Sequence, residues 1–264
     1  MPSYVIHYIC GNKLIENYKV TPKEKSLFLV GNLIPDSSKI FGNVDITSIK
    51  NDFRKIHRKE IQTEKLTTHF RRKEDRNNVV MLPYPEQFKN KYGITDLVTL
   101  GYYYHLYTDK YFFNDIFKKS FEFLDNNLEI TSNNNEAIYV RIKKNNKVVS
   151  KDEFFSTSYL YHDYTVMNKL LLEYFRIMFN ENELREYINE IENNIEEVDF
   201  KNIESVIRDT LLYIEESKNT DDTNLKVFDK NIIINFINEL NNNFYRENKQ
   251  LIKKVGLKNV RDNN

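Results

Sequence analysis

Residues 100–109 read LGYYYHLYTD and place His105 and Asp109 four residues apart inside a long apolar and aromatic run. In a helix, side chains four residues apart leave the same face, one turn from each other. An imidazole and a carboxylate are costly to bury on an apolar face unless another group satisfies them. A divalent metal would satisfy both, so the spacing predicts half of a metal site on a buried helix. The alternative is a core histidine bonded to a backbone carbonyl and an aspartate paired with Lys or Arg.

Helical periodicity continues on both sides of this run. Thr95 or Asp96 is expected to cap its helix, which should continue to about Phe123. Further helices are expected over residues 3–18, 22–31 with Gly31 as the stop, 85–93, 152–179 with a break near 157–158, 182–194, 200–217 and 229–246. Residues 137–149 predict a small β-hairpin, and residues 39–80 are polar and irregular. The predicted fold class is therefore mostly α, a multi-helix bundle of one domain over residues 1–264 with a small β-hairpin.

Composition and charge argue against several classes of protein. The 264 residues carry 39 basic and 39 acidic side chains, and this zero net charge argues against a general nucleic-acid binder, although not against a nuclease with a local groove. The single Cys10 forbids an internal disulfide and fits a reducing compartment. The first residues lack the pattern of a signal peptide, and no apolar run approaches membrane-spanning length. We therefore expect a soluble, cytoplasmic protein, while the sequence is silent on its oligomeric state.

Three further residues are candidate metal ligands. His7 lies on the expected first helix among apolar neighbours, His69 lies in a Thr-His-Phe segment, and Asp36 follows Pro35 in a turn. Taken one at a time, each fits a structural role better: a satisfied core histidine, an exposed or structural histidine and an Asx-turn aspartate. They support a metal site only if all three occur together with the His105 and Asp109 pair.

His162 and Asp163 form an adjacent pair near the start of an expected helix. Neighbouring residues point to different helix faces, so both would bind one metal only at a distorted or terminal turn. The alternative for Asp163 is an early-turn residue favoured by the helix dipole. His57 has cations on both sides, which disfavour a metal, and is left out of the site.

Basic and aromatic side chains are the candidates for contacting a substrate. Two basic segments, residues 54–59 and 71–73, could attract a phosphate-bearing substrate, or could simply be solvated faces. Arg71 and Arg72 are the candidates from the second segment. Among the tyrosines of the 100–109 run, Tyr104 is the candidate for an apolar or stacking wall, although the ordinary role of such a residue is in the core.

Four segments occur in an order that resembles the zinc-dependent phospholipase C family, especially its short, leaderless bacterial relatives. They are the first helix with His7, FLVGNLIPD at 28–36, THF at 68–70 and LGYYYHLYTD at 100–109. Family members typically show a His-bearing first helix, a Gly-Asn-x-x-Pro-Asp turn, a Ser/Thr-His-Phe segment and a Leu-Gly-Tyr-x-x-His-x-x-x-Asp helix. YHDY at 161–164 is similar to the aromatic, Asp-containing stretch that follows in such relatives. The resemblance covers about residues 1–175.

The resemblance implies a helical bundle with a zinc site that hydrolyses phosphoester bonds. By position, Asp36, His69, His105 and Asp109 match the ligands of one zinc, and His7 with Asp109 as a bridge matches part of a second. The secreted enzymes also use an N-terminal Trp and a later His with a His-x-x-x-Glu pair, whereas this chain has no Trp and offers only His162 and Asp163 downstream. The expectation is therefore one or two ions, zinc or another divalent metal.

The leading hypothesis is a metal-dependent phosphoester hydrolase, in which Asp36 also orients or deprotonates the attacking water. Its substrate would be a small phosphoester or a phospholipid. Alternatives within enzymes are a nuclease or nucleotide phosphodiesterase, and an HD-type phosphohydrolase built on His162 and Asp163. The non-enzyme alternative is a helical interaction protein whose polar pairs only fix packing.

Overall fold

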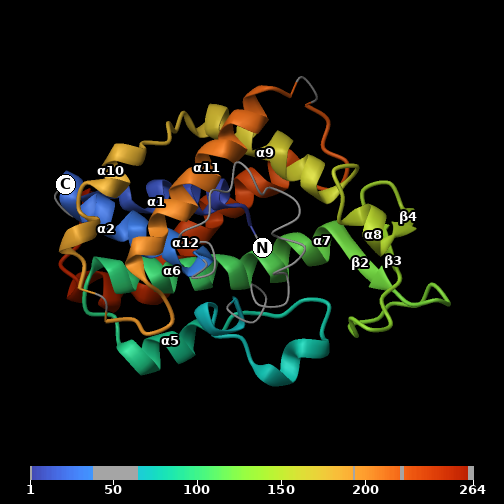
Figure 1. Ribbon diagram of the computed structural model, residues 1–264, viewed down its shortest axis with the longest axis horizontal. Helices are drawn as coiled ribbons and strands as arrows, with labels where there is room; N and C mark the ends of the chain where they lie inside the picture. The colour runs from blue at the N-terminus through green and yellow to red at the C-terminus, as the bar shows by residue number, and fades with distance from the viewer. Residues whose placement is uncertain (1, 38–64, 193, 221–222, 261–264) are drawn as a thin grey trace.

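The computed structural model describes residues 2–37, 65–192, 194–220 and 223–260 (Figure 1). The α-helices are α1 (Tyr4–Ile15), α2 (Pro22–Leu33), α5 (Pro85–Tyr92), α6 (Leu97–Tyr111), α7 (Lys118–Ser120), α8 (Lys151–Phe154), α9 (Leu160–Phe175), α10 (Glu181–Arg185), α11 (Ile203–Lys218) and α12 (Lys230–Lys254). Short 3-10 helices are η1 (Ile34–Asp36), η4 (Lys73–Asn77), η6 (Ile188–Glu190) and η7 (Phe200–Asn202), and η5 (Phe112–Phe117) is a π-helix. The strands are β1 (Tyr18–Lys19), β2 (Phe121–Leu124), β3 (Tyr139–Ile142), β4 (Lys147–Ser150) and β5 (Lys258–Asn259).

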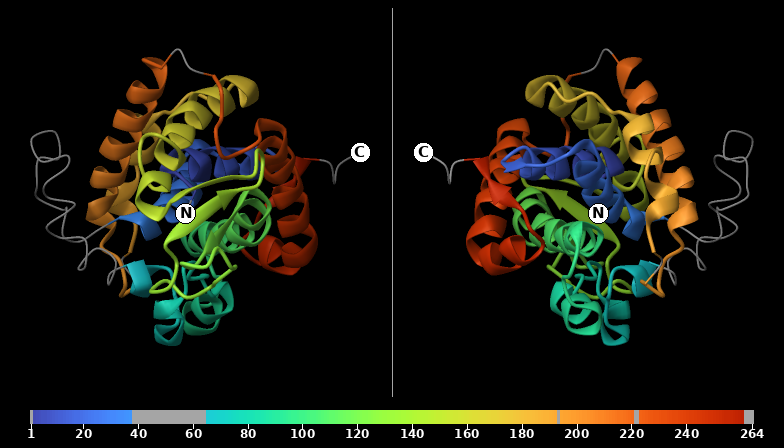
Figure 2. Two further views of the ribbon diagram at one scale, coloured as in Figure 1. Left: turned by 90° about the vertical axis from the view of Figure 1, so that its right-hand side faces the viewer. Right: turned by 90° about the vertical axis from the view of Figure 1, so that its left-hand side faces the viewer.

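The chain folds as a mostly α protein, as the sequence predicts. Helix α6 runs through the middle of the bundle, and α1, α2, α5 and α12 all pack against it (Figure 1). Helices α9 and α11 pack against each other and against α1, and the views along the long axis show α12 on the opposite side of α1 (Figure 2). Within the described ranges, no helix is both long enough and apolar enough to cross a membrane.

Helices α2 and α6 cross at two glycines. A Cβ on Gly31 would lie 2.2 Å from the Val98 carbonyl oxygen, and a Cβ on Gly101 would lie 2.2 Å from that of Phe28. Only glycine allows backbones this close. The expectation that Gly31 stops its helix is therefore wrong: α2 continues to Leu33, because this glycine serves helix packing and not termination.

Capping signals locate the starts of both crossing helices. Thr21 and Glu24 form a reciprocal capping box at the start of α2, with Pro22 as the first helical residue. Asp96 and Thr99 form another at the start of α6, which confirms the predicted N-cap. Gly93, with φ of 69°, ends α5 as expected.

The far end of the central helix differs from the prediction of one helix to Phe123. After Tyr111 the chain passes through the π-helix η5 and the short α7, and residues 121–124 become strand β2. The predicted hairpin, β3 and β4, is confirmed, and β2 adds a third antiparallel strand in the order β2-β3-β4, with Phe121 opposite Ile142. The alternating FEFL sequence pairs with the hairpin and buries Phe121 and Phe123, which outweighs helix continuation.

Several other boundaries move. Helix α1 ends at Ile15, the 182–194 segment shortens to α10 followed by η6, and the break near 157–158 separates α8 from α9 as predicted. Helix α12 is kinked at Asn248, where φ is −120° and ψ is 20°, close to the expected end near 246; beyond the kink it continues to Lys254, and buried Phe244 and Ile252 keep one face of both parts in the core. Within residues 39–80, the described part contains η4 and a short helical turn before His69.

Candidate metal centre

Five predicted ligands from four parts of the chain converge inside the bundle. His7 comes from α1, Asp36 from the end of η1, His69 from the turn after residue 68, and His105 and Asp109 from α6. Asp36 is 3% exposed and the other four are fully buried. Two overlapping triads have ligand atoms within 4.8 Å of one another: His7, Asp36 and His105, and His69, His105 and Asp109.

The spacing of the ligand atoms matches the edge of a metal tetrahedron. Zinc bonds of about 2.0–2.1 Å in tetrahedral geometry place ligand atoms about 3.3 Å apart. The Nε2 atoms of His69 and His105 are 3.2 Å apart, and His69 Nε2 lies 3.5 Å from Asp36 Oδ1. Asp109 Oδ2 lies 3.5 Å from His69 Nε2, and Asp109 Oδ1 lies 3.4 Å from His7 Nε2. Each oxygen of Asp109 therefore faces a different histidine.

Neighbouring oxygens hold two of the imidazoles through their far nitrogens. The Nδ1 atom of His105 lies 2.8 Å from the Asn32 carbonyl oxygen, which can only accept a hydrogen bond, so Nδ1 carries the proton. Nε2 of His105 is then the free lone pair that faces the other ligands. Thr68 Oγ1 lies 2.9 Å from Nδ1 of His69 and can support the same tautomer there. Such outer contacts are the usual support of a metal-binding histidine.

The remaining polar atoms of the cluster have buried, unmet hydrogen-bonding capacity. Both ring nitrogens of His7 and both carboxylate oxygens of Asp109 lack a hydrogen-bond partner among the described residues. Leaving such groups unsatisfied costs about 1–3 kcal/mol each, and more when the group is charged. The donor set and its spacing fit a cation that would use these atoms, and this favours a metal site over the purely structural alternative.

The histidine pKa values favour metal binding. Burial lowers the pKa of His69. Burial, followed by the neighbouring His7, holds the pKa of His105 well below its usual value. Both imidazoles are therefore neutral near pH 7, which is the form that binds a metal.

The carboxylates stay ionised although they are buried. Burial raises the pKa of Asp36, but the Lys65 ammonium and His69 outweigh it and hold the pKa well below the usual range. For Asp109, burial is likewise outweighed by the neighbouring imidazoles of His7, His69 and His105, so its pKa is also lowered. The cluster thus presents two anionic and three histidine donors.

Two cations lie beside the carboxylates. Lys65 Nζ is 3.1 Å from Asp36 Oδ1, and Arg71 Nη2 is 3.8 Å from Asp109 Oδ2. The formal charges of Lys65, Arg71, Asp36 and Asp109 sum to zero. Bound divalent cations would leave the site with excess positive charge, which suits an anionic ligand.

The structure contradicts the assignment of His162 and Asp163 as ligands. Asp163 is fully buried, but its two oxygens accept hydrogen bonds from the backbone amides of Lys226, Val227 and Phe228 at 2.7–2.9 Å. His162 Nδ1 lies beside it, 3.7 Å from Oδ1. Neither residue belongs to the described groups that could hold a metal. Asp163 instead fixes the segment before α12.

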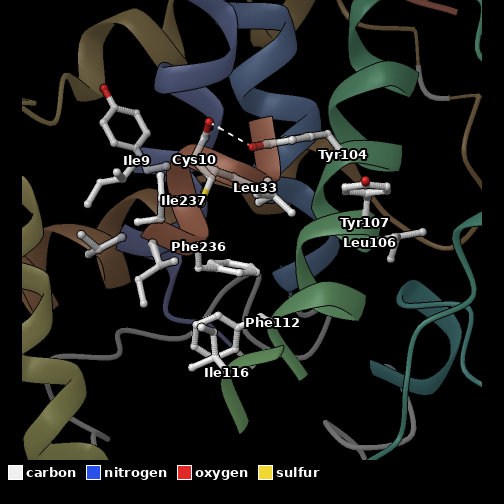
Figure 3. Packing of buried hydrophobic residues seen from close by; sticks show 14 of the residues in the cluster. Ile9, Cys10, Leu33, Tyr104, Leu106, Tyr107, Phe112, Ile116, Phe236 and Ile237 are labelled. Carbon is white, nitrogen blue, oxygen red and sulfur yellow. Dashed lines mark hydrogen bonds between the residues drawn. The ribbon is translucent and has the colours of Figure 1, made fainter. Parts of the chain in front are cut away.

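The structure places the three substrate-contact candidates in different surroundings. Tyr104 is fully buried and its hydroxyl donates to the Cys10 carbonyl oxygen and to Asn241, so it is a core residue (Figure 3). Arg72 is exposed and its guanidinium stacks on the Tyr84 ring at 3.9 Å. Arg71 is the candidate that the structure places at the cluster. The basic segment 54–59, with His57, lies outside the described residues.

Sequence reasoning missed three supporting residues. Asn32 supplies the carbonyl that orients His105, and its side-chain amide donates to the His7 carbonyl oxygen at 2.7 Å. Thr68 and Lys65 contact His69 and Asp36. Asn32 and Thr68 lie inside the 28–36 and 68–70 segments, so their positions in those motifs could have indicated a supporting role. No sequence pattern indicated a role for Lys65.

No protein-family model, curated protein or solved structure matches this chain, so the resemblance to zinc-dependent phospholipases C stays a prediction.

Proposed function

We propose that this protein is a metal-dependent phosphoester hydrolase, with zinc as the metal that best fits the cluster. The observation that carries the proposal is the Asp109 carboxylate, whose two oxygens face His7 and His69 and have no hydrogen-bond partner among the described residues. Three histidine and two carboxylate donors are a typical set for zinc.

The same cluster supports two ions. The rings of His7 and His105 are stacked, with centroids 3.8 Å apart and planes 14° from parallel. Nearly parallel rings suit two neighbouring ions better than one shared ion, and two-metal hydrolytic sites hold their ions about 3.5–4 Å apart. Asp109, whose oxygens face His7 and His69, would help to hold both ions.

The proposed chemistry is hydrolysis of a phosphoester: water attacks phosphorus, the bond from phosphorus to the ester oxygen breaks, and the alcohol leaves with a proton that originates from the water. When bound to these residues, zinc would supply an activated water and polarise a phosphoryl oxygen. Asp36, ionised and held by Lys65, accepts a hydrogen bond from the attacking water and orients it. The lowered pKa values of His69 and His105 favour the neutral, metal-binding forms, and burial of the site strengthens the charge interactions within it.

Metal analysis of purified protein tests the proposal. We expect one to two zinc ions per chain in the wild type and a marked loss in His105→Asn and Asp109→Asn. His162→Asn is the matched control, because His162 lies outside the cluster, and should keep its zinc. Absence of transition metal from wild-type protein grown with zinc would contradict the proposal.

A substrate panel then separates the candidate substrate classes. Zinc-loaded protein should hydrolyse at least one of a chromogenic phosphodiester, a short-chain phosphatidylcholine and single-stranded DNA. Activity should fall with zinc content in the two cluster variants. Stoichiometric zinc in a protein that hydrolyses none of these would favour a structural metal and the non-enzyme alternative.

A further inference from the structure

Arg71 is the one guanidinium that contacts the cluster among the described residues, and its surroundings are unusual. Its side chain is only 8% exposed. Nε and Nη2 have no hydrogen-bond partner among the described residues, and Asp109 Oδ2 lies 3.8 Å away, beyond hydrogen-bond distance. The ring of Phe113 lies 6.0 Å from the guanidinium carbon, a weak contact. A buried guanidinium with free donors is costly unless a ligand uses them.

The position of Arg71 relative to solvent points to a ligand that arrives from outside. The side chains of His7, His69 and Asp109 are fully buried and that of Asp36 is 2% exposed. Arg71 and Lys65, at 8% and 23%, are the more exposed charged groups that touch these ligands. An anion entering the cluster would therefore meet cations before it meets the carboxylates.

The balance of charge around Arg71 indicates when its guanidinium can bind an anion. Without a metal, the Asp109 carboxylate is the negative charge that faces the guanidinium, with its Oδ2 atom 3.8 Å from Arg71 Nη2. A cation bound by Asp109 would neutralise that carboxylate and leave the guanidinium charge uncompensated. The fork of donors on Arg matches two non-bridging oxygens of a phosphoryl group.

We propose that Arg71 is the residue that holds the phosphoryl group of the ligand at this site, and that it does so once a metal has taken Asp109 as its partner. This role rests on the proposed function, since it requires a loaded cluster. Arg71 acts by binding and orienting two phosphoryl oxygens. It also makes metal and anion binding cooperative, because the metal frees the guanidinium for the anion.

Calorimetric titration of inorganic phosphate into zinc-loaded and metal-free protein tests the proposal. Arg71→Met should lower phosphate affinity by about 10- to 100-fold, the usual worth of hydrogen bonds to a charged group. Arg71→Lys keeps the charge without the fork and should give a smaller loss. Arg72→Met, a change at the adjacent exposed arginine, should leave affinity unchanged. Metal-free wild type should bind phosphate more weakly than the zinc-loaded form.

Zinc content, measured on every sample, distinguishes the possible failures. Equal phosphate affinity in Arg71→Met and wild type, at equal zinc content, would overturn the role of Arg71 alone. Equal losses in Arg71→Met and Arg72→Met would overturn it too, since they would show a general charge effect. Absence of zinc from the wild type would instead overturn the proposed function. A parallel titration with dimethyl phosphate reports whether a diester is held as well, and a selective Arg71 loss with either probe supports the assignment.

Discussion

Gly101→Ala would disturb the crossing of α2 and α6 and, through it, the candidate metal centre. The added Cβ would lie 2.2 Å from the Phe28 carbonyl oxygen and 2.8 Å from the Asn32 amide nitrogen. Both neighbours are backbone atoms, so no side chain can turn away and the helices must separate. His105 lies one turn beyond Gly101 on the same face, and its 2.8 Å contact with the Asn32 carbonyl spans this crossing.

Two opposing effects set the magnitude. Replacing glycine by alanine inside a helix favours folding by about 1 kcal/mol. Overpacking costs about 1–3 kcal/mol, and more when backbone must move. An overlap of about 1 Å with one backbone atom and a smaller overlap with a second belong at the upper end of this cost, so we expect a net loss of about 2 kcal/mol in the free energy of unfolding. With a urea slope of about 2 kcal/mol/M, the unfolding midpoint would fall by about 1 M.

Urea unfolding followed by circular dichroism measures this loss, and zinc titration measures the effect on the site. Gly31→Ala should behave like Gly101→Ala, because its Cβ meets the Val98 backbone. Gly11→Ala is the comparison variant: its closest contact is the Asn32 side-chain amide at 2.6 Å, so it should disturb the Asn32–His7 hydrogen bond and leave the backbone crossing of α2 and α6 in place. Zinc affinity should fall with stability in Gly101→Ala. A Gly101→Ala protein as stable as the wild type would refute the close crossing.

Two further predictions concern the charged groups. In metal-free protein, the pKa values of His69 and His105 are lowered, so their contribution to stability is complete above the usual histidine pKa of about 6.5. Stability falls as the pH drops through that value, because the unfolded chain then binds more protons than the folded chain. The lowered pKa values of Asp36 and Asp109 extend the loss of stability below about pH 4. Thermal melting between pH 8 and pH 3 checks this, and a melting temperature that does not change from pH 7.5 to 5 would contradict it. Asp163→Asn should lower the free energy of unfolding in urea by about 1–3 kcal/mol, because an NH2 donor replaces one of the two oxygens that accept from three backbone amides. The zinc content of this variant should stay unchanged. Loss of zinc would instead indicate that Asp163 belongs to the metal site.

The sequence was most informative where local chemistry decides the structure. Capping residues located the starts of α2 and α6, and the i, i+4 spacing of His105 and Asp109 correctly placed both on one buried helix face. The order of the motifs added His7, Asp36 and His69 to the candidate ligands, and the fold brings these three residues together with His105 and Asp109. Such signals act within a turn or two of helix, so a linear pattern contains them.

Tertiary packing decided what those signals left open. A glycine reads locally as a helix stop, yet Gly31 lies inside α2 because another backbone needs the space. Asp163 reads as a ligand candidate, yet the amides of residues 226–228 take its oxygens. The sequence suggested that Tyr104 lines the site, yet its hydroxyl points toward the Cys10 carbonyl oxygen in the core.

The sequence by itself thus determined the helical class, the helix starts and the donor types of the candidate centre. Only the tertiary structure decided which donors share a site, that each oxygen of Asp109 faces a different histidine, and that Arg71 is the arginine beside it. The physical reason is range: helix propensity and capping depend on neighbours along the chain, whereas a metal centre depends on side chains from distant segments that meet only when the core packs.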